Sequence, residues 1–256
     1  MKKLYFCTNT KMSKNLAQTR EYLTDLRART ADLLEQDLID LAVMPSFTAL
    51  ETAAQVLAGS RITYGGQDVC ESGEVEYTGE VSAGMLRELG AGIVMIGHSE
   101  RRRIFGENNK TLNRKVKMTL KEGMTALLSV SETAADKEAG ISAERLRIQL
   151  RECLEEVTDT DRVRILYEPA WAIGVSGTSA DPAYAGQMHE CIRECLREMY
   201  KDKADEIPLM YGGSVNSENA PGLLAQLQID GLGIGRSAWN AAEFDAIMRC
   251  ACTGRK

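Results

Sequence analysis

The sequence predicts a single-domain α/β protein folded as a (β/α)₈ barrel. Its 256 residues are the usual length of one such barrel. Short apolar runs alternate with longer helical patterns, and polar or glycine residues follow several of the runs directly. The eight runs expected to form strands are Leu4–Cys7, Ile39–Met44, Ile62–Tyr64, Gly92–Ile96, Ala126–Val130, Val163–Tyr167, Pro208–Tyr211 and Leu232–Ile234.

The segments between these runs carry helix signals. Asp181-Pro182 is typical of a helix cap followed by a first-turn proline. The helix it begins has apolar residues three or four positions apart from Ala185 to Met199. Repeated strand–helix units favour a parallel sheet, and eight of them favour its closure into a barrel. No linker or shift in composition divides the chain, so we expect one domain over residues 1–256.

The composition excludes several classes of function. A net charge of −6 provides no basic surface for nucleic acid, and no apolar run approaches the ~18 residues of a membrane span. The apolar stretch near the N-terminus is too short for a signal peptide. Seven cysteines without a Cys-x-x-Cys motif are expected to be free thiols, which suits a cytoplasmic protein.

Metal and cofactor motifs are absent from the sequence. There are only two histidines and no His-Glu-x-x-His or Asp-rich calcium pattern. Asn9, His98 and Glu168 offer possible ligand atoms, but such a metal site is not favoured. We therefore expect neither a metal nor a cofactor.

Polar residues lie at the carboxyl ends of the predicted strands. In a (β/α)₈ barrel those ends meet at one mouth, where active sites form. Residues far apart in the sequence are therefore expected to come together. They are Asn9 and Lys11, then Gly97–Glu100, then Glu168, then Gly212–Ser214, and finally Gly235.

Glu168 is the candidate base. It ends an apolar strand and precedes Pro169 and a loop over 170–178 that contains Gly174 and Gly177. A carboxylate in a partly dry mouth can move protons, and a loop of this kind can fold over a substrate and exclude water. The alternative is a surface glutamate before a turn.

His98 and Lys11 supply the other candidate groups. Ser99 and Glu100 can begin a short helix after His98, and a helix N-terminus disfavours an imidazolium, so a neutral, hydrogen-bond-donating His98 is expected. Lys11 can place a cation near an anionic substrate. The alternatives are a core histidine and an ordinary exposed lysine. His189, in the middle of a helix, is interpreted as structural or surface-exposed.

Two glycine-rich strand ends favour phosphate binding. Gly212–Ser214 and Gly231–Gly235 follow the seventh and eighth strands, where backbone N–H groups commonly bind phosphate in such barrels. The alternative is tight-turn geometry, which glycine allows without any ligand.

With these residues in place, the sequence resembles the triosephosphate isomerase family over essentially its whole length. The His98 and Glu168 motifs are long and specific, and all the motifs occur in family order. The matching stretches are Asn9–Met12, Gly66–Asp68, Tyr77–Glu80, Ile96–Arg102, Tyr167–Gly174 and Tyr211–Val215.

The resemblance implies the chemical roles. Glu168 would move a proton between two carbons, and His98 would act on the substrate oxygens as a neutral electrophile, a pairing that belongs to the family and is carried over with it. Lys11 and Asn9 would hold the substrate, with Glu100 as an accessory carboxylate. The phosphate would lie on Gly174, Ser214 and the backbone at Gly235, and Arg236, where this sequence departs from the family, would add a forked cation near it. The lid would comprise Pro169, Ala170, Trp171, Ala172, Ile173, Gly174 and Val175, latched by Tyr211 and Ser214.

The resemblance also implies a homodimer. The loop Gln67–Glu80 would reach the partner's active site, with Thr78 near the neighbour's Asn9 and Lys11. Glu80 and Arg101 would form an ion pair between subunits.

Three departures from the family pattern bear on the substrate. Thr10 stands where the family usually has tryptophan, Val175–Ser179 lacks the usual lid lysine, and Arg236 replaces the second glycine of a Gly-Gly pair. Arginine in glycine-only backbone angles would cost about 1–2 kcal/mol. The stretch Gly235–Asn240 resembles a branch that isomerises a four-carbon ketose phosphate. A triose phosphate is the first expectation and a tetrulose phosphate the second; a non-catalytic phosphosugar-binding barrel and a barrel lyase or synthase are further alternatives.

Overall fold

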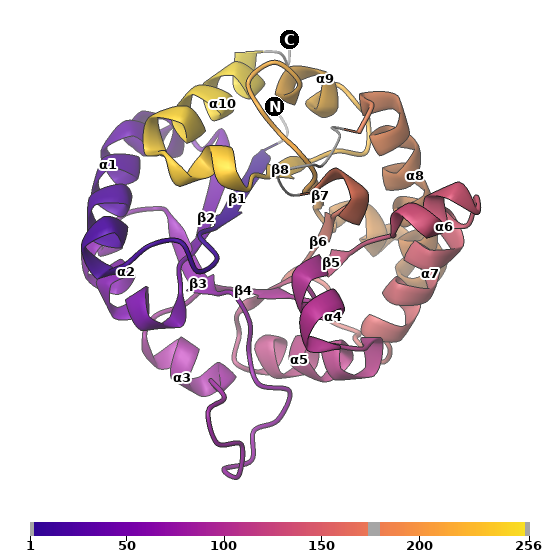
Figure 1. Cartoon of the computed structure of the whole chain (residues 1–256), viewed down its shortest axis with the longest axis horizontal. Helices are drawn as coiled ribbons and strands as arrows, with labels where there is room; N and C mark the ends of the chain where they lie inside the picture. Colours follow the sequence, from indigo (N-terminus) through magenta and orange to yellow (C-terminus); the bar gives the residue numbers. More distant parts are fainter. Residues whose placement is uncertain (1–2, 174–179, 254–256) are drawn as a thin grey trace.

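The fold is a closed barrel of eight parallel strands surrounded by helices, as predicted (Figure 1). The computed structural model describes residues 3–173 and 180–253. Each strand pairs with its neighbours in chain order, and β8 closes the barrel against β1. The strands are β1 (Leu4–Asn9), β2 (Ile39–Met44), β3 (Thr63–Gly66), β4 (Ile93–Ile96), β5 (Thr125–Val130), β6 (Val163–Tyr167), β7 (Leu209–Tyr211) and β8 (Gly231–Gly233).

The helices form the outer ring. The cap found in the sequence is present: Asp181 accepts a hydrogen bond from the Ala183 N–H at the start of α8, with Pro182 in its first turn. Gly123, with φ +72°, follows the end of α5. The α-helices are α1 (Leu16–Glu35), α2 (Leu50–Leu57), α3 (Ala83–Glu88), α4 (Ser99–Phe105), α5 (Asn109–Lys121), α6 (Ala134–Glu138), α7 (Ser142–Cys153), α8 (Pro182–Tyr200), α9 (Ala220–Leu224) and α10 (Ala241–Thr253). The 3₁₀ helices of the described residues are η1 (Phe47–Ala49), η2 (Ala170–Ala172), η3 (Lys201–Glu206) and η4 (Arg236–Trp239).

Six strands differ from their predicted bounds by one or two residues, and in β3 and β8 the reason is that glycine serves packing. β3 continues through Gly65 and Gly66, and β8 begins at Gly231. A Cβ on Gly65 would lie 1.6 Å from the Ile93 carbonyl oxygen, and one on Gly231 would lie 2.0 Å from that of Tyr5. These glycines therefore allow neighbouring strands to approach closely.

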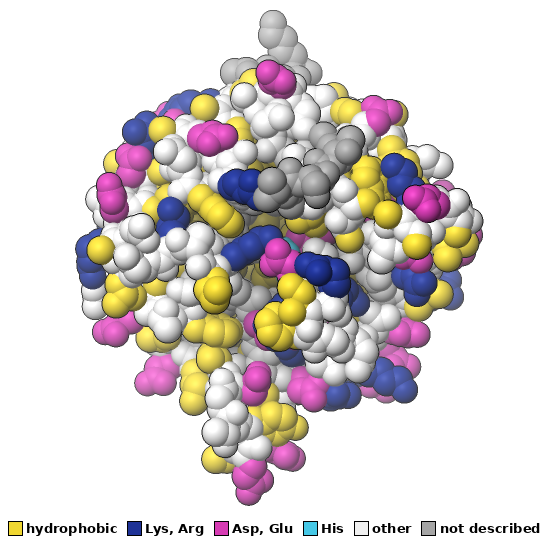
Figure 2. Space-filling model, viewed as in Figure 1, with side chains coloured by type: hydrophobic (Ala, Val, Ile, Leu, Met, Phe, Trp, Pro, Cys, Tyr) yellow, Lys and Arg dark blue, Asp and Glu magenta, His cyan; other side chains and the backbone are white. Residues whose placement is uncertain are grey.

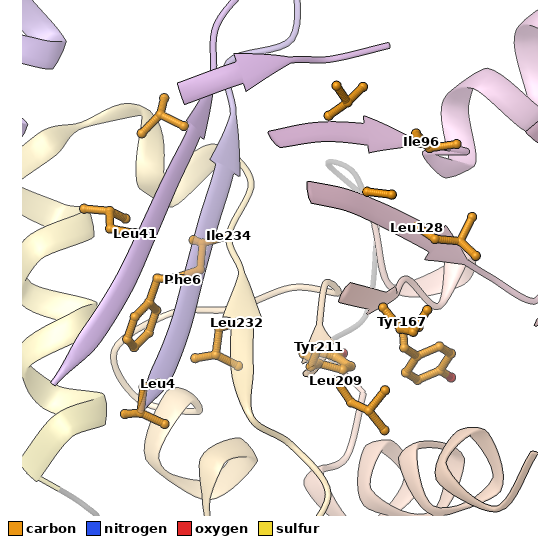
Figure 3. Close-up of a cluster of buried hydrophobic side chains, with 14 of the residues drawn as sticks. Leu4, Phe6, Leu41, Ile96, Leu128, Tyr167, Leu209, Tyr211, Leu232 and Ile234 are labelled. Atoms are coloured by element: carbon orange, nitrogen blue, oxygen red, sulfur yellow. The ribbon is translucent and has the colours of Figure 1, made fainter. Parts of the chain in front are cut away.

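The core has two parts. Cys7, Met44, Met95, Leu127 and Leu166 belong to the small cluster contributed by the strands alone. The larger cluster fills the space between strands and helices. Figure 3 labels ten of its side chains, on seven strands and the residue after β8: Leu4, Phe6, Leu41, Ile96, Leu128, Tyr167, Leu209, Tyr211, Leu232 and Ile234.

Two further findings bear on the predicted protein class. All seven cysteines lie in the described residues and are free thiols. Over the same described ranges, no helix combines the length and apolar character that crossing a membrane requires.

His189 is fully buried on α8, packed edge-on against Tyr167, and burial lowers the pKa of its imidazole from 6.5 to about 4. The unfolded chain therefore binds a proton below pH 6.5 that the folded chain refuses until about pH 4. Stability contributed by this group is complete above pH 6.5 and falls as the pH drops through that window, by about 3 kcal/mol in all.

We expect the His189→Gln variant to lose this part of the pH dependence. Urea denaturation of both proteins at pH 7 and pH 4.5 measures it, since other titrating groups contribute equally to the two. Parallel pH profiles for the variant and the parent would contradict the assignment.

Candidate active site

A cavity of about 250 Å³ opens at the carboxyl ends of the strands. Figure 2 shows basic, acidic and histidine side chains gathered in the hollow at the centre of this face. Nine of the predicted site residues line the cavity: Asn9, Lys11, His98, Glu168, Ala172, Ile173, Ser214, Gly235 and Arg236.

Glu168 directly follows β6 and is only 4% exposed, which excludes the surface-glutamate alternative. Its Oε2 accepts a hydrogen bond from the Ser99 N–H at 3.1 Å, and its Oε1 lies 3.4 Å from Nε2 of His98. The carboxylate is thus held in one orientation beside the imidazole. It can accept a proton from a group bound in the cavity.

His98 is the N-cap of α4. Its Nδ1 accepts a hydrogen bond from the Glu100 N–H at 3.1 Å, so in this arrangement the ring proton is on Nε2. Nε2–H is therefore available to donate to a substrate oxygen or to Glu168.

The backbone of Lys11, at the mouth of the barrel, has the left-handed angle φ +48°. This conformation is unusual for a residue other than glycine. The Asn9 side-chain oxygen accepts from its N–H, and Gln67 donates to its carbonyl oxygen. Its Nζ forms an ion pair with Glu100 at 2.7 Å. Burial by itself would raise the pKa of the Glu100 carboxyl, but the Lys11 hydrogen bond and charge outweigh it and hold that pKa below its usual value.

The two glycine-rich strand ends meet on one side of the cavity. Ser214, Gly235 and Arg236 line it, and a Cβ on Gly213 would lie 2.1 Å from the Tyr211 hydroxyl. The expected backbone strain at Arg236 is wrong: this residue does not have a positive φ, because it begins the 3₁₀ helix η4.

The lid residues from Pro169 to Ile173 are described, whereas Gly174 and Val175 lie outside the described residues. Trp171, on η2, donates its indole N–H to Glu132 Oε1 at 2.9 Å, and the Tyr167 hydroxyl donates to the same oxygen at 2.7 Å. The ammonium of Lys137 lies 3.5 Å from the centre of the Trp171 ring. Tyr211, one of the two predicted latch residues, is fully buried.

Sequence reasoning missed two residues that support the site. Glu132 is buried two positions after the end of β5. An acidic residue just after a predicted strand was the signal that could have identified it. Trp239 lines the cavity, and its indole N–H donates to the Asn9 carbonyl oxygen at 2.9 Å. Nothing in the local pattern around Trp239 predicted that contact.

The predicted interface residues lie around the β3–α3 loop, which extends away from the barrel (Figure 1). Thr78 and Glu80 are exposed there, and Val75 is 97% exposed. Arg101 makes its ion pairs within the chain, with Asp68 and Glu107, each at 2.8 Å.

Comparison with known proteins agrees with this arrangement. The sequence model of the family described as triosephosphate isomerase matches residues 4–251. The triosephosphate isomerase of Chlorobium chlorochromatii is 41% identical over 98% of this chain and 99% of its own. The L-erythrulose-1-phosphate isomerase of Rhizobium rhizogenes is 37% identical over 95% and 93%, and that of Brucella abortus is 36% identical over 98% of both chains.

A match along nearly the whole chain, on a closed eight-stranded barrel, leaves one assignment. The chain belongs to the triosephosphate isomerase family of sugar-phosphate isomerases.

Proposed function

We propose that this chain interconverts dihydroxyacetone phosphate and glyceraldehyde 3-phosphate by proton transfer between adjacent carbons. The observation that carries the proposal is the convergence of Glu168, His98 and Lys11, from three different strand ends, on one cavity. A base, a neutral hydrogen-bond donor and a cation are the groups that an enediolate intermediate requires.

Glu168 is the proposed base. The Ser99 N–H holds one carboxylate oxygen, which orients the other for a substrate carbon. Glu168 removes the proton from one carbon, and the electron pair forms the enediolate. It then returns the proton to the adjacent carbon while the hydroxyl proton passes from one substrate oxygen to the other, so no redox cofactor or metal is consumed.

His98 and Lys11 stabilise the negative charge that develops on the substrate oxygens. The ring proton on Nε2 of His98 is positioned to donate because Nδ1 is occupied by the Glu100 N–H. Lys11 and Asn9 add a cation and an amide beside it. These groups are fixed before the substrate binds, so they need little reorganisation during the reaction.

The phosphate is proposed to bind where Ser214 and Gly235 line the cavity, with Gly174 completing the site from the lid. The lid that follows Pro169 would close over the substrate and be held by Tyr211 and Ser214. Its exclusion of water would strengthen every electrostatic contact in the cavity.

The enzyme is proposed to act as a cytoplasmic homodimer. The extended β3–α3 loop, with its almost fully exposed Val75, is the surface that supports dimerisation. Gln67, Thr78, Glu80 and Arg101 would lie at that interface. The seven free thiols are consistent with a reducing compartment.

A four-carbon ketose phosphate is the second candidate substrate. The specific observation is Arg236, whose side chain extends from the cavity wall at the carboxyl end of β8. Curated relatives of similar identity are named L-erythrulose-1-phosphate isomerase. The same three catalytic groups would serve either substrate.

The deciding experiment compares kcat/KM for dihydroxyacetone phosphate and L-erythrulose 1-phosphate with one enzyme preparation. We expect the triose phosphate to be favoured by at least about 10-fold, the usual scale for one additional carbon in a pocket. A preference of that size for the tetrulose phosphate would establish the second candidate. Binding of both without turnover of either would leave a non-catalytic phosphosugar-binding barrel.

A further inference from the structure

The charged side chains that line the cavity differ in whether a charge of opposite sign lies beside them. Among the described lining residues, Lys11, Glu168 and Arg236 carry charge when His98 is neutral. Lys11 is already paired with Glu100 at 2.7 Å. Glu168 is an anion beside the reacting carbons. A substrate that carries a phosphate dianion therefore enters a cavity in which the charge of Lys11 is already partly neutralised.

Arg236 is the lining cation that remains. It is exposed at the wall, and it forms no ion pair with any residue of the described ranges 3–173 and 180–253. A guanidinium presents a planar fork of donors that matches two phosphate oxygens. As far as the described residues go, the fork can form that contact without first breaking an ion pair.

The backbone that carries Arg236 is held from two sides. Trp239 donates to the Asn9 carbonyl oxygen at 2.9 Å, and the Tyr22 hydroxyl donates to the Ala238 carbonyl oxygen at 2.7 Å. η4 is thereby attached to β1 and α1. Arg236 thus extends from a fixed position, and only its side chain must be ordered when a ligand binds.

We propose that the Arg236 guanidinium binds the phosphate dianion of the substrate and makes this enzyme select doubly charged end groups. The contact is electrostatic and acts in addition to backbone N–H groups. It applies to a triose or a tetrulose phosphate alike, and it rests on the proposed function only in requiring a phosphorylated substrate.

The test measures kcat/KM and the inhibition constant of inorganic phosphate for the parent, Arg236→Gln and Arg236→Lys, at low and high ionic strength. We expect Arg236→Gln to lower kcat/KM and to weaken phosphate inhibition by about 10- to 100-fold, the scale of hydrogen bonds to a charged group. Arg236→Lys should restore part of both values. The salt dependence of phosphate inhibition should be smaller in Arg236→Gln than in the parent.

The selection for a dianion has its own readout. Inhibition of the parent by inorganic phosphate should strengthen as the pH rises and the dianion forms, and Arg236→Gln should lose much of that increase.

In Arg236→Gly, guanidinium ion below denaturing concentrations should restore part of the activity. The matched control is Arg162→Gln, which removes the same charge from an exposed residue at the opposite end of the barrel, directly before β6.

Three results would overturn the inference. The first is that phosphate inhibits Arg236→Gln as strongly as the parent. This holds even if kcat/KM falls, because a residue with a merely structural role would lower kcat/KM without changing phosphate inhibition. An equal effect of Arg162→Gln is another, and an unchanged pH profile of inhibition is the third. Failure of the proposed function is distinct, since it would appear as a parent enzyme without turnover while phosphate binding and its dependence on Arg236 could still be measured by calorimetry.

Discussion

Replacing Glu168 by glutamine is expected to lower kcat by at least about 10²- to 10⁴-fold, the usual contribution of a general base. Glutamine has nearly the same shape, and its side-chain oxygen can still accept the Ser99 N–H that Oε2 accepts in the parent at 3.1 Å. The amide cannot take a proton from carbon. The loss should therefore appear in kcat, with a small change in KM, because the binding groups remain.

A second substitution separates position from chemistry. Glu168→Asp keeps the carboxylate but withdraws it by one methylene, so its activity should lie between those of the parent and Glu168→Gln. Glu243→Gln, on the exposed surface of α10, is the matched control for the loss of one negative charge. Steady-state kinetics with circular dichroism as a check on folding measures all three. Parent-like turnover in Glu168→Gln would rule out Glu168 as the base.

Replacing Arg193 by methionine is expected to lower the free energy of unfolding by about 3–5 kcal/mol, the usual cost of leaving one member of a buried ion pair alone. The side chains of Arg193 and Asp230 are 1% and 2% exposed and lie 3.1 Å apart. Asp230 also accepts the Leu209 N–H at 3.0 Å. The guanidinium donates to the carbonyl oxygens of Ala204 and Ile207.

The cost arises because the buried Asp230 carboxylate would keep its charge without the guanidinium that neutralises it in the parent. Methionine fills a similar volume, so little of the loss would come from a cavity. The pair joins α8 and η3 to the start of β8, the strand that leads to Gly235. Its loss should therefore loosen the β7–β8 side of the barrel as well as lower stability.

Urea denaturation at one protein concentration measures the effect, with two comparisons. The double variant Arg193→Met with Asp230→Asn should recover part of the loss, since it removes the lone charge. Arg197→Met, which breaks only exposed pairs with Glu190 and Asp205, should cost no more than about 1 kcal/mol. Equal losses for Arg193→Met and Arg197→Met would contradict the account.

The strand boundaries illustrate how far local patterns reach. β2 and β6 have the predicted bounds because their residues are apolar almost throughout. The bounds of β3 and β8 were predicted wrongly because glycine, considered without its neighbours in space, indicates a turn. Only the neighbouring strands reveal that Gly65 and Gly231 are needed for close approach.

The site illustrates the same limit. Placing Glu168, His98 and Lys11 together required only strand order and the rule that the carboxyl ends of barrel strands meet. Glu132 and Trp239 escaped notice because each acts through a partner distant in the sequence, Trp171 and Asn9 respectively. Such contacts depend on side-chain directions that no local pattern encodes.

The amino-acid sequence by itself determined the barrel, the eight strands and the residues that gather at its mouth. Periodicity and the order of motifs are local properties, and they suffice for those conclusions. The tertiary structure decided which of the described groups are buried and which are already paired with one another. Glu168 is buried beside His98, Lys11 is partly neutralised by Glu100, and Arg236 begins η4 without backbone strain. These features depend on distances and burial, and those arise only when distant segments pack against one another.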